Sequence, residues 1–550
     1  MTPRFATSAP EHRWWHGAVV YQVYVRSFAD ANGDGIGDLA GLFSRLDYLA
    51  DLGVDALWLN PCYASPQRDH GYDIADYFAI DPDYGTLADF DRLIAGARER
   101  GIRVLMDMVA NHCSADHAWF QAALAAPRGS RERARFHFAD GRGVDGSEPP
   151  TNYESVFGGG AWSRVSEPDG TPGQWYLHLF DSSQPDLNWA SPDVVQHFDD
   201  VLRFWFGRGV AGFRVDVAHG MAKAPELVDV VPGADGHPAW DQPGVHDIVR
   251  RWRGIGDAAP DGERYWVGEV WVTDAALARY VAPDEFHQAF SFDLMLQPWH
   301  EPSLRAAIDR SIARANTQSG PAWALSSHDV HRVATRYGQA IDLEPPDPKD
   351  MIGSARKRGP VDIELGARRS RAAALIQMAL PGTVYLYQGE ELGLPEVLEM
   401  DPADRQDPIW RRSGGTEYGR DGCRVPLPWS RTAPNWGFST TASAASAWLP
   451  QPREFGRYCA FDEQADPGSV FSVYAAAVAA RKQYFAPHAP LEWIDAPPGV
   501  LAFRRGRVAC VANLSDEAMP VPVRGEVLLS STPGTPGWLG ADAAVYVETE

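Results

Sequence analysis

Apolar runs and amphipathic stretches alternate along most of the chain. Gly41–Leu52 carries leucines at the three- and four-residue spacing of a helix, and Gly53 follows as a stop signal. A second helix is predicted between Thr86, whose hydroxyl suits a helix cap, and Gly101. A third is predicted to begin at Pro192, because proline is tolerated in the first turn of a helix.

The apolar runs between these helices have the length of β-strands. They are Gly17–Val25, Asp55–Leu59, Val104–Val109, Gly212–Val215, Trp266–Gly268, Phe290–Asp293, Trp323–Ser326 and Thr383–Tyr387. Eight strands, each followed by a helix or a long loop, predict an α/β fold with a parallel (β/α)₈ TIM barrel. Active sites of such barrels lie at the carboxyl ends of the strands, so acidic and histidine residues there are the first candidates for chemistry.

The alternation is interrupted once and stops near the C-terminus. Residues 113–176 are rich in Gly, Pro, Arg and Ser and have weak periodicity, which predicts a small inserted domain after strand 3. From residue 491 onward the pattern changes to short β runs such as Val508–Asn513, typical of a C-terminal β-sandwich. The predicted division is barrel 1–112, inserted loop-rich domain 113–176, barrel 177–490 and β domain 491–550.

Composition and charge narrow the classes of protein that remain. With 45% hydrophobic and 22% charged residues, the chain is typical of a folded soluble protein. Its formal net charge of −23 disfavours nucleic acid and anionic membranes as partners and favours a neutral ligand. The five cysteines form no CxxC motif, which argues against a disulfide framework or a zinc site. The chain lacks a signal-peptide pattern and any apolar run of the ~18 residues that a membrane helix needs, so a cytoplasmic location is predicted.

Three carboxylates stand at the ends of predicted strands. Asp216 ends strand 4, Glu269 follows strand 5 and Asp329 follows strand 7. A single acidic residue at such a place is more often a cap or an ion-pair partner, but a barrel directs all three toward one axis. Retaining hydrolysis of a glycosidic bond needs a carboxylate nucleophile and a carboxylic acid roughly 5–5.5 Å apart, and a third carboxylate can hold sugar hydroxyls.

Neighbouring residues predict how two of these carboxylates differ in protonation. Arg214 lies two residues before Asp216, on the same side of the strand, and is expected to keep Asp216 ionised. Glu269 lies in the apolar and aromatic stretch Tyr265–Trp271, and partial burial there is expected to keep it protonated for the acid step.

Six motifs in a fixed order carry a resemblance to a known family. They are Asp107–His112, Gln184–Asn188, Gly212–Asp216, Gly268–Glu269, His328-Asp329 and Tyr387–Glu391. With them the chain resembles glycoside hydrolase family 13, the α-amylase family, and within it the oligo-1,6-glucosidase and α-glucosidase group, from about Trp14 to Trp429 and more weakly to the end. The resemblance implies a retaining, exo-acting α-glucosidase that releases glucose from the non-reducing end of maltose- or isomaltose-type sugars by double displacement.

The resemblance also implies roles for individual residues. Asp216 is the expected nucleophile, Glu269 the acid/base and Asp329 the stabiliser of the transition state. The expected substrate-binding residues are Asp73, Tyr72, His112, Arg214, His328 and Arg424. Among these Tyr72 would be a stacking platform and Asp73 would hold the terminal glucose, with a plain loop cap as the alternative for Asp73. Arg332 is a second candidate for the arginine that Arg424 would supply at the substrate entrance.

The loop after strand 1 presents oxygen ligands at alternate positions. These are Asp30, Asn32, Asp34, Ile36 and Asp38. The spacing predicts a structural Ca²⁺ or Mg²⁺ site, as this subgroup often has, whereas an EF-hand is excluded by Gly41 at loop position 12. The alternative is a loop of Asx-turns without a metal. The mechanism needs no metal in either case.

Two positions depart from the family pattern, and several functions stay open. Ser327 stands where many members have Asn, and Val217 is only a hint at α-1,6 cleavage, so the linkage preference is open. The main alternative function is an α-glucosyltransferase or a sugar isomerase of the sucrose isomerase or trehalose synthase type, through the same glucosyl–Asp216 intermediate. An endo-amylase fits Asp73 less well, and a non-catalytic transporter heavy chain is disfavoured because all three carboxylates are present. A monomer or a homodimer would fit.

Overall fold

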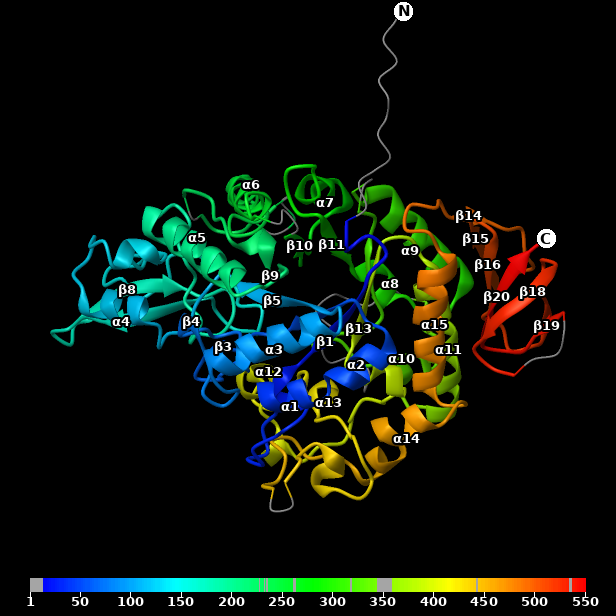
Figure 1. Cartoon of the computed structure of the whole chain (residues 1–550). Coiled ribbons are helices and arrows are strands. Elements are labelled where there is room, and N and C mark those ends of the chain that lie inside the picture. The colour runs from blue at the N-terminus through cyan, green and yellow to red at the C-terminus, as the bar shows by residue number, and fades with distance from the viewer. Residues whose placement is uncertain are drawn as a thin grey trace, which may run out of the picture.

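A closed barrel of eight parallel strands forms the centre of the molecule (Figure 1). The computed structural model describes residues 13–226, 228–231, 233, 236–260, 264–316, 319–343, 359–441, 444–533 and 537–550. The barrel order is β1-β13-β12-β11-β10-β9-β5-β2, with every neighbouring pair parallel. The strands are β1 Val19–Val23, β2 Ala56–Leu59, β5 Arg103–Val109, β9 Gly212–Asp216, β10 Tyr265–Gly268, β11 Gln288–Ser291, β12 Ala322–Ala324 and β13 Thr383–Tyr387. The predicted TIM barrel is confirmed, strand by strand.

Both faces of the barrel strands are buried, which explains why they read as continuous apolar runs. One set of side chains, including Val20, Leu105 and Tyr385, fills the barrel interior together with Trp15. The alternate set packs outward against the surrounding helices. The barrel is therefore a filled core, and the side chains considered for chemistry lie toward the carboxyl ends of the strands.

The helices follow their sequence signals with one exception. α3 (Leu87–Glu99) begins in a capping box between Thr86 and Asp89, and α5 (Pro192–Gly207) begins at its proline. The single helix expected over Gly41–Leu52 is instead two helices, α1 (Leu39–Ser44) and α2 (Leu46–Leu52). The break falls at Arg45, whose guanidinium lies over the rings of Trp429 and Phe461.

The other helices complete the outer layer and the regions after β13. They are α6 Gly244–Asp257, α7 Asp274–Tyr280, α8 Phe292–Leu296, α9 Glu301–Arg314, α10 Val333–Tyr337, α11 Ile363–Ala379, α12 Pro408–Arg412, α13 Asp421–Arg424, α14 Ala460–Ala465 and α15 Val470–Tyr484. Among the described residues, none of these helices has the length and apolar character needed to cross a membrane. The five cysteines are free and buried.

The segment after β5 departs from the barrel rhythm, as predicted. It contains α4 (Ala118–Ala125) and a three-stranded antiparallel sheet of β6 (Phe138–Ala139), β8 (Pro172–Leu177) and β7 (Trp162–Ser166). A short hairpin of β3 (Tyr63–Ala64) and β4 (Asp76–Ile80) precedes it in the chain. The inserted segment and the C-terminal sheet lie on opposite flanks of the barrel (Figure 1). The domain boundaries at 113 and 176 stay predictions.

The C-terminal region is built from two antiparallel sheets. The larger has the order β14 (Glu492–Trp493), β15 (Val500–Arg505), β16 (Val508–Asn513), β20 (Ala543–Thr549) and β18 (Gly525–Ser530). The smaller pairs β17 (Met519–Pro520) with β19 (Trp538–Leu539), and Leu539 shares a small core with one face of the larger sheet. The other face packs on α11, where Tyr546 Oη donates to the carbonyl of Leu375 at 2.6 Å. The predicted C-terminal β domain is confirmed.

Candidate active site

Arg214 lies at the centre of the candidate site and contacts three carboxylates. Arg214 and Asp216 stand two residues apart at the carboxyl end of β9, so both side chains point to the same side of the strand. The guanidinium lies 2.8 Å from Asp107 Oδ1, 2.5 Å from Asp216 Oδ1 and 2.7 Å from Glu269 Oε2. The structure therefore brings the expected Asp216 and Glu269 together and adds Asp107 from the neighbouring strand β5.

Burial and mutual repulsion favour a proton within this cluster. Burial raises the pKa of Asp107 to about 6, although Arg214 opposes the rise. Burial and the charges of Glu269 and Asp107 also raise the pKa of Asp216, again against the pull of Arg214. One guanidinium cannot neutralise three carboxylates, so Arg214 does not fix the ionisation of Asp216 by itself. Burial therefore favours a proton on Asp107 or Asp216, and these two neighbouring carboxyl groups titrate together.

Glu269 lies among hydrogen-bond donors. Its Oε2 accepts from Arg214 and from the N–H of Val217 at 3.0 Å, and its Oε1 accepts from Trp271 Nε1 at 3.0 Å. Val217 reaches this oxygen because its backbone is left-handed, with φ +41°, an uncommon conformation for a β-branched residue. Glu269 is partly buried, as expected, and its carboxylate also accepts from donors of β9 and the residue after it, while its protonation stays a prediction.

Asp329 is held by two arginines and a histidine. Arg420 Nη1 and Arg424 Nη2 lie 3.0 and 2.9 Å from Asp329 Oδ1, and His328 Nε2 lies 3.1 Å from Oδ2. Burial would raise the pKa of Asp329, but His328 and the two arginines hold it well below its usual range. Asp329 is thus ionised, whereas burial raises the pKa of Asp107 and of Asp216, so carboxylates in one site are placed in two different electrostatic environments.

Tyr72 and His328 stack on each other. Their ring centroids are 5.3 Å apart with an interplanar angle of 3°. Tyr72 Oη donates to Asp107 Oδ2 at 3.0 Å and lies 2.7 Å from His328 Nε2. Gln22 Nε2 can only donate and lies 2.7 Å from His328 Nδ1, so Nδ1 accepts and Nε2 carries the proton. The structure places both residues in the site, and the stacking of Tyr72 on a sugar ring stays a prediction.

The carboxylate of Asp73 accepts hydrogen bonds from residues of its own loop. Its Oδ1 accepts from Ser65 Oγ and from the N–H of Asp69, both at 3.0 Å, and its Oδ2 accepts from the N–H of Arg68 at 3.0 Å. The residue is 0% exposed. These contacts are those of the loop cap that the sequence left as an alternative, and the structure does not support a direct contact between Asp73 and a sugar.

Asp69 and Arg420 are site residues that the sequence reasoning missed. Arg420 Nη2 lies 2.9 Å from Asp69 Oδ1, while Nε lies 2.7 Å from Asp407 Oδ2. Arg420 therefore joins Asp69, Asp329 and the buried Asp407. A signal was present, because Asp69 begins the turn that contains Asp73 and Arg420 lies one helical turn before Arg424.

The two arginines that the sequence proposed for the substrate entrance are both buried. Arg424 is 0% exposed and donates to the carbonyl of His328 at 2.9 Å in addition to its contact with Asp329. Arg332 donates to the carbonyls of Gln388 and Cys423, each at 2.8 Å. Arg424 thus contacts a catalytic candidate but not an entrance, and Arg332 supports the loops after β13.

His112 joins the site from the end of β5. Its Nε2 lies 3.1 Å from the carbonyl oxygen of Tyr72 and 3.3 Å from Gln184 Nε2. Gln184 in turn donates to Asp69 Oδ2 at 3.0 Å. The motif Gln184–Asn188 thus packs against the same turn that carries Asp69 and Tyr72.

The predicted metal loop is held by its own hydrogen bonds. Asp30 accepts from the N–H groups of Gly33 and Gly35 and from Ser439 Oγ. Asp34 accepts from Ile36 N–H and Asn32 Nδ2, and Asp38 caps α1. Such contacts are typical of the alternative, a loop of Asx-turns. In the described part of the chain, no group of three or more His, Cys, Asp or Glu side chains is placed to hold a metal. Ca²⁺ or Mg²⁺ binding at this loop stays a prediction.

Loops from distant parts of the chain meet beside these residues. Arg412 of α12 donates to the carbonyl of Gly158 in the inserted segment and lies 3.3 Å from Asp181 Oδ2. The Arg420 guanidinium lies 5.3 Å from the ring of Phe157. The inserted segment and the region after β13 are thus bridged across one side of the candidate site.

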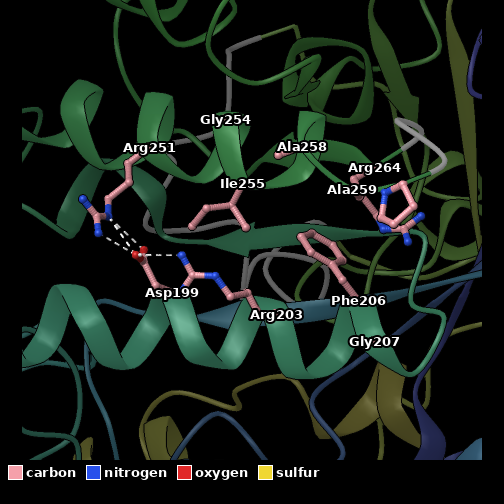
Figure 2. Close-up of a pocket in the computed structure, with 11 residues that line it drawn as sticks. Asp199, Arg203, Phe206, Gly207, Arg251, Gly254, Ile255, Ala258, Ala259 and Arg264 are labelled. Carbon is pink, nitrogen blue, oxygen red and sulfur yellow. Dashed lines mark hydrogen bonds and ion pairs between the residues drawn. The ribbon is translucent and has the colours of Figure 1, made fainter.

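A groove of about 840 Å³ between α5 and α6 lies away from this chemistry. Figure 2 shows that Asp199 on α5 is paired with Arg251 of α6 and with Arg203. Phe206 and Ile255 line the floor of the groove. Its charges are paired with each other on the outer helices, so size alone does not identify the functional site.

Comparison with known proteins agrees with the geometry. The family described as "Alpha amylase, catalytic domain" matches residues 22–488, and "Domain of unknown function (DUF3459)" matches residues 496–546. The chain is 37% identical to a probable alpha-glucosidase of Rhizobium meliloti (strain 1021), over 94% of this chain and 93% of the relative. It is 33% identical to an oligo-1,6-glucosidase of Parageobacillus thermoglucosidasius, over 86% and 84% of the two chains. The structure of an alpha-glucosyl transfer enzyme, XgtA, superposes with a TM-score of 0.82 at 35% identity and covers 98% of this chain and 100% of that one.

Proposed function

The chain belongs to the α-amylase family of glycoside hydrolases, and on this basis we propose that it is a retaining, exo-acting α-glucosidase of maltose- or isomaltose-type sugars. One observation carries the proposal: a single guanidinium, that of Arg214, contacts both Asp216 and Glu269. Two carboxyl groups on one guanidinium are close neighbours, as a retaining mechanism with a separation of roughly 5–5.5 Å requires.

In the first step, Asp216 attacks the anomeric carbon while Glu269 gives its proton to the glycosidic oxygen. The bond from Asp216 to glucose forms as the bond to the leaving sugar breaks, and the leaving sugar departs with the proton. Arg214 supports this step because its guanidinium contacts Asp216 and lowers its pKa against the effect of burial, which favours the ionised nucleophile. The ionised Asp329 supports it because a fixed negative charge favours the oxocarbenium-like transition state.

In the second step, Glu269 is the base. It takes a proton from water, the water oxygen attacks the anomeric carbon and the bond to Asp216 breaks. Glucose leaves with its configuration retained, and Asp216 and Glu269 return to their starting protonation states.

Exo action is supported by the contacts that surround the turn Asp69–Asp73. Arg420, Gln184 and His112 converge on this turn from three different parts of the chain. The bridge from Arg412 to Gly158 adds a further connection on the same side. Such cross-connections favour a site that receives the end of a sugar chain over one that is open at both ends.

A glucosyl transferase is the second candidate, and Trp271 favours it. Trp271 is 37% exposed, stacks on Phe292 at a centroid distance of 3.8 Å and donates to Glu269. An exposed aromatic face beside the acid/base can hold an acceptor sugar in place of water. The likeness to XgtA, whose name states glucosyl transfer, points in the same direction.

Glucose release from maltose and from isomaltose at matched concentration tests the proposal. Rapid release from at least one of them is the expected result, and the ratio of the two rates assigns the linkage preference. New oligosaccharides without net glucose at high sugar concentration would favour the transferase. A folded protein that consumes neither sugar contradicts the α-glucosidase assignment.

A further inference from the structure

A fully buried lysine lies behind the candidate site. Lys223 follows β9, a few residues after Val217, and its side chain is 0% exposed. Its ammonium lies 2.8 Å from Asp186 Oδ2, donates to Asn111 Oδ1 at 2.7 Å and donates to the carbonyl of Gly220. An ammonium has three donor positions and no acceptor, so these three oxygens account for it fully.

Lys223 fixes the direction of the Asn111 amide. Only the amide oxygen can face an ammonium, so the amide nitrogen is on the other side, 3.1 Å from His112 Nδ1. An amide nitrogen only donates, which means that His112 Nδ1 accepts and that the proton of the neutral ring is on Nε2. Burial lowers the pKa of His112 to about 4, so the ring is neutral near pH 7.

The second ring nitrogen agrees with this assignment, because the nearby Gln184 Nε2, 3.3 Å away, has its two protons accounted for by Asp69 Oδ2 and the carbonyl of Tyr72. His112 Nε2 lies 3.1 Å from the carbonyl oxygen of Tyr72, an atom that can only accept. With the proton on Nε2 this contact is a hydrogen bond, whereas the other tautomer would place a lone pair against the carbonyl. A chain of contacts thus runs from Lys223 through Asn111 and His112 to the turn that carries Tyr72.

We propose that Lys223 is a positioning residue which, through Asn111, sets His112 in the tautomer with the proton on Nε2. His112 then donates this proton to the carbonyl of Tyr72 and so holds the turn that carries Asp69 and Tyr72 in place at the site. Only the effect on turnover stated below rests on the proposed function. The ion pair with Asp186 assigns a role to the aspartate of the motif Gln184–Asn188, namely to keep Lys223 charged at this place.

Nitrogen-15 NMR of histidine-labelled, full-length protein tests the tautomer. The signals of His112 are assigned by their loss in His112→Gln. The wild-type protein is expected to carry a proton on Nε2 and none on Nδ1. Asn111→Asp is nearly isosteric but has only acceptor oxygens, so it is expected to move a proton to Nδ1. If the enzyme is a glucosidase, kcat/KM is then expected to fall roughly 10- to 100-fold, as for a lost buried hydrogen bond.

A second variant tests Lys223 itself. Lys223→Met combined with Asp186→Leu removes both charges together, so that neither is left buried alone. It is expected to give a mixture of the two tautomers. Lys482→Met, at a partly exposed lysine paired with Asp55, is the matched control and should leave His112 unchanged.

Two results would overturn the proposal: a proton on Nδ1 in the wild type, or an unchanged tautomer in either folded variant. A wild-type protein with the stated tautomer and no hydrolysis of any glucoside would instead contradict the proposed function. The two failures are therefore distinguishable.

Discussion

Two ion-pair clusters in this molecule have opposite ratios of arginine to carboxylate. At the mouth of the barrel one arginine, Arg214, serves three carboxylates. On the outer helices one carboxylate, Asp199, serves two arginines, Arg203 and Arg251. The first cluster is buried and has more carboxylates than arginines, and burial raises the pKa of Asp107 and of Asp216. The second has its arginines about half exposed, where solvent screens their charge.

The comparison indicates that an excess of buried carboxylates distinguishes a candidate catalytic cluster from an ion-pair cluster that only stabilises the fold. Both clusters have short ion pairs, and the outer one borders a groove. Only in the inner one do several carboxyl groups compete for one guanidinium, where burial raises the pKa of Asp107 and Asp216. Ion pairs and a groove are therefore not sufficient to identify the functional site.

The largest expected difference comes from neutral replacements in the two clusters. Asp216→Asn or Glu269→Gln is expected to lower kcat by roughly 10⁴-fold, because each removes a reacting group while its shape remains. The matched change Asp199→Asn is expected to leave kcat near the wild-type value. Steady-state kinetics with the preferred sugar, together with circular dichroism to verify folding, measures the difference. Near-normal turnover in a clean Asp216→Asn preparation would refute the assignment of the nucleophile.

A second prediction compares Arg420, which contacts carboxylates of the candidate site, with Arg251 of the outer cluster. Arg420→Lys is expected to lower kcat/KM roughly 10- to 100-fold, because a compact ammonium cannot reach Asp69, Asp329 and Asp407 together. Arg251→Lys on the outer cluster should change kcat/KM by less than about twofold. The kinetics of the two variants, measured in parallel, decide the matter. Equal effects would show that Arg420 is only structural.

The third prediction is a shift in the pH profile. Asp107→Asn removes one negative charge, and neighbouring negative charges raise the pKa of Asp216. Without that charge Asp216 loses its proton at lower pH, so the acid limb of kcat/KM, which reports ionisation of the nucleophile, should move to lower pH by about one unit. The profile of Asp199→Asn should coincide with that of the wild type. A shift of the Asp107→Asn limb to higher pH would contradict this interpretation.

The smallest effect is expected from divalent cations. Adding Ca²⁺ to metal-stripped protein is expected to raise the unfolding midpoint by only about 1–4 °C. The loop from Asp30 to Asp38 is already held by hydrogen bonds, including that of Ser439, and it takes no part in the reaction. Asp34→Asn is expected to abolish the rise without changing kcat. Loss of turnover on chelation would assign the metal a role beyond structure.

Much of this arrangement could be read from the sequence because it depends on local patterns. Barrel strands are apolar on both faces, so continuous apolar runs in the sequence identified all eight barrel strands. Residues two apart on a strand share a side, so Arg214 and Asp216 could be paired in advance. The carboxylates after strands 4, 5 and 7 followed from the rule that barrel strands end at one face.

What could not be read depends on contacts between distant segments. Arg420 meets Asp69 across most of the chain, and no spacing rule connects the two. The resemblance assigned Asp73 to the terminal glucose and did not consider Asp69, and only backbone geometry shows that the turn itself uses the carboxylate of Asp73. The donors Arg214 and Val217 of Glu269 could not be read either, since they come from another strand and the residue after it.

The left-handed backbone of Val217 has a consequence for engineering. Its N–H contacts the acid/base, and its side chain occupies the position that hints at linkage preference. Glycine at this position would relieve backbone strain of roughly 1–2 kcal/mol and would loosen the placement of Glu269 at the same time. Substitutions at position 217 are therefore expected to change thermal stability, turnover and linkage preference together. A screen that measures only one of these properties will not rank the variants correctly for the other two.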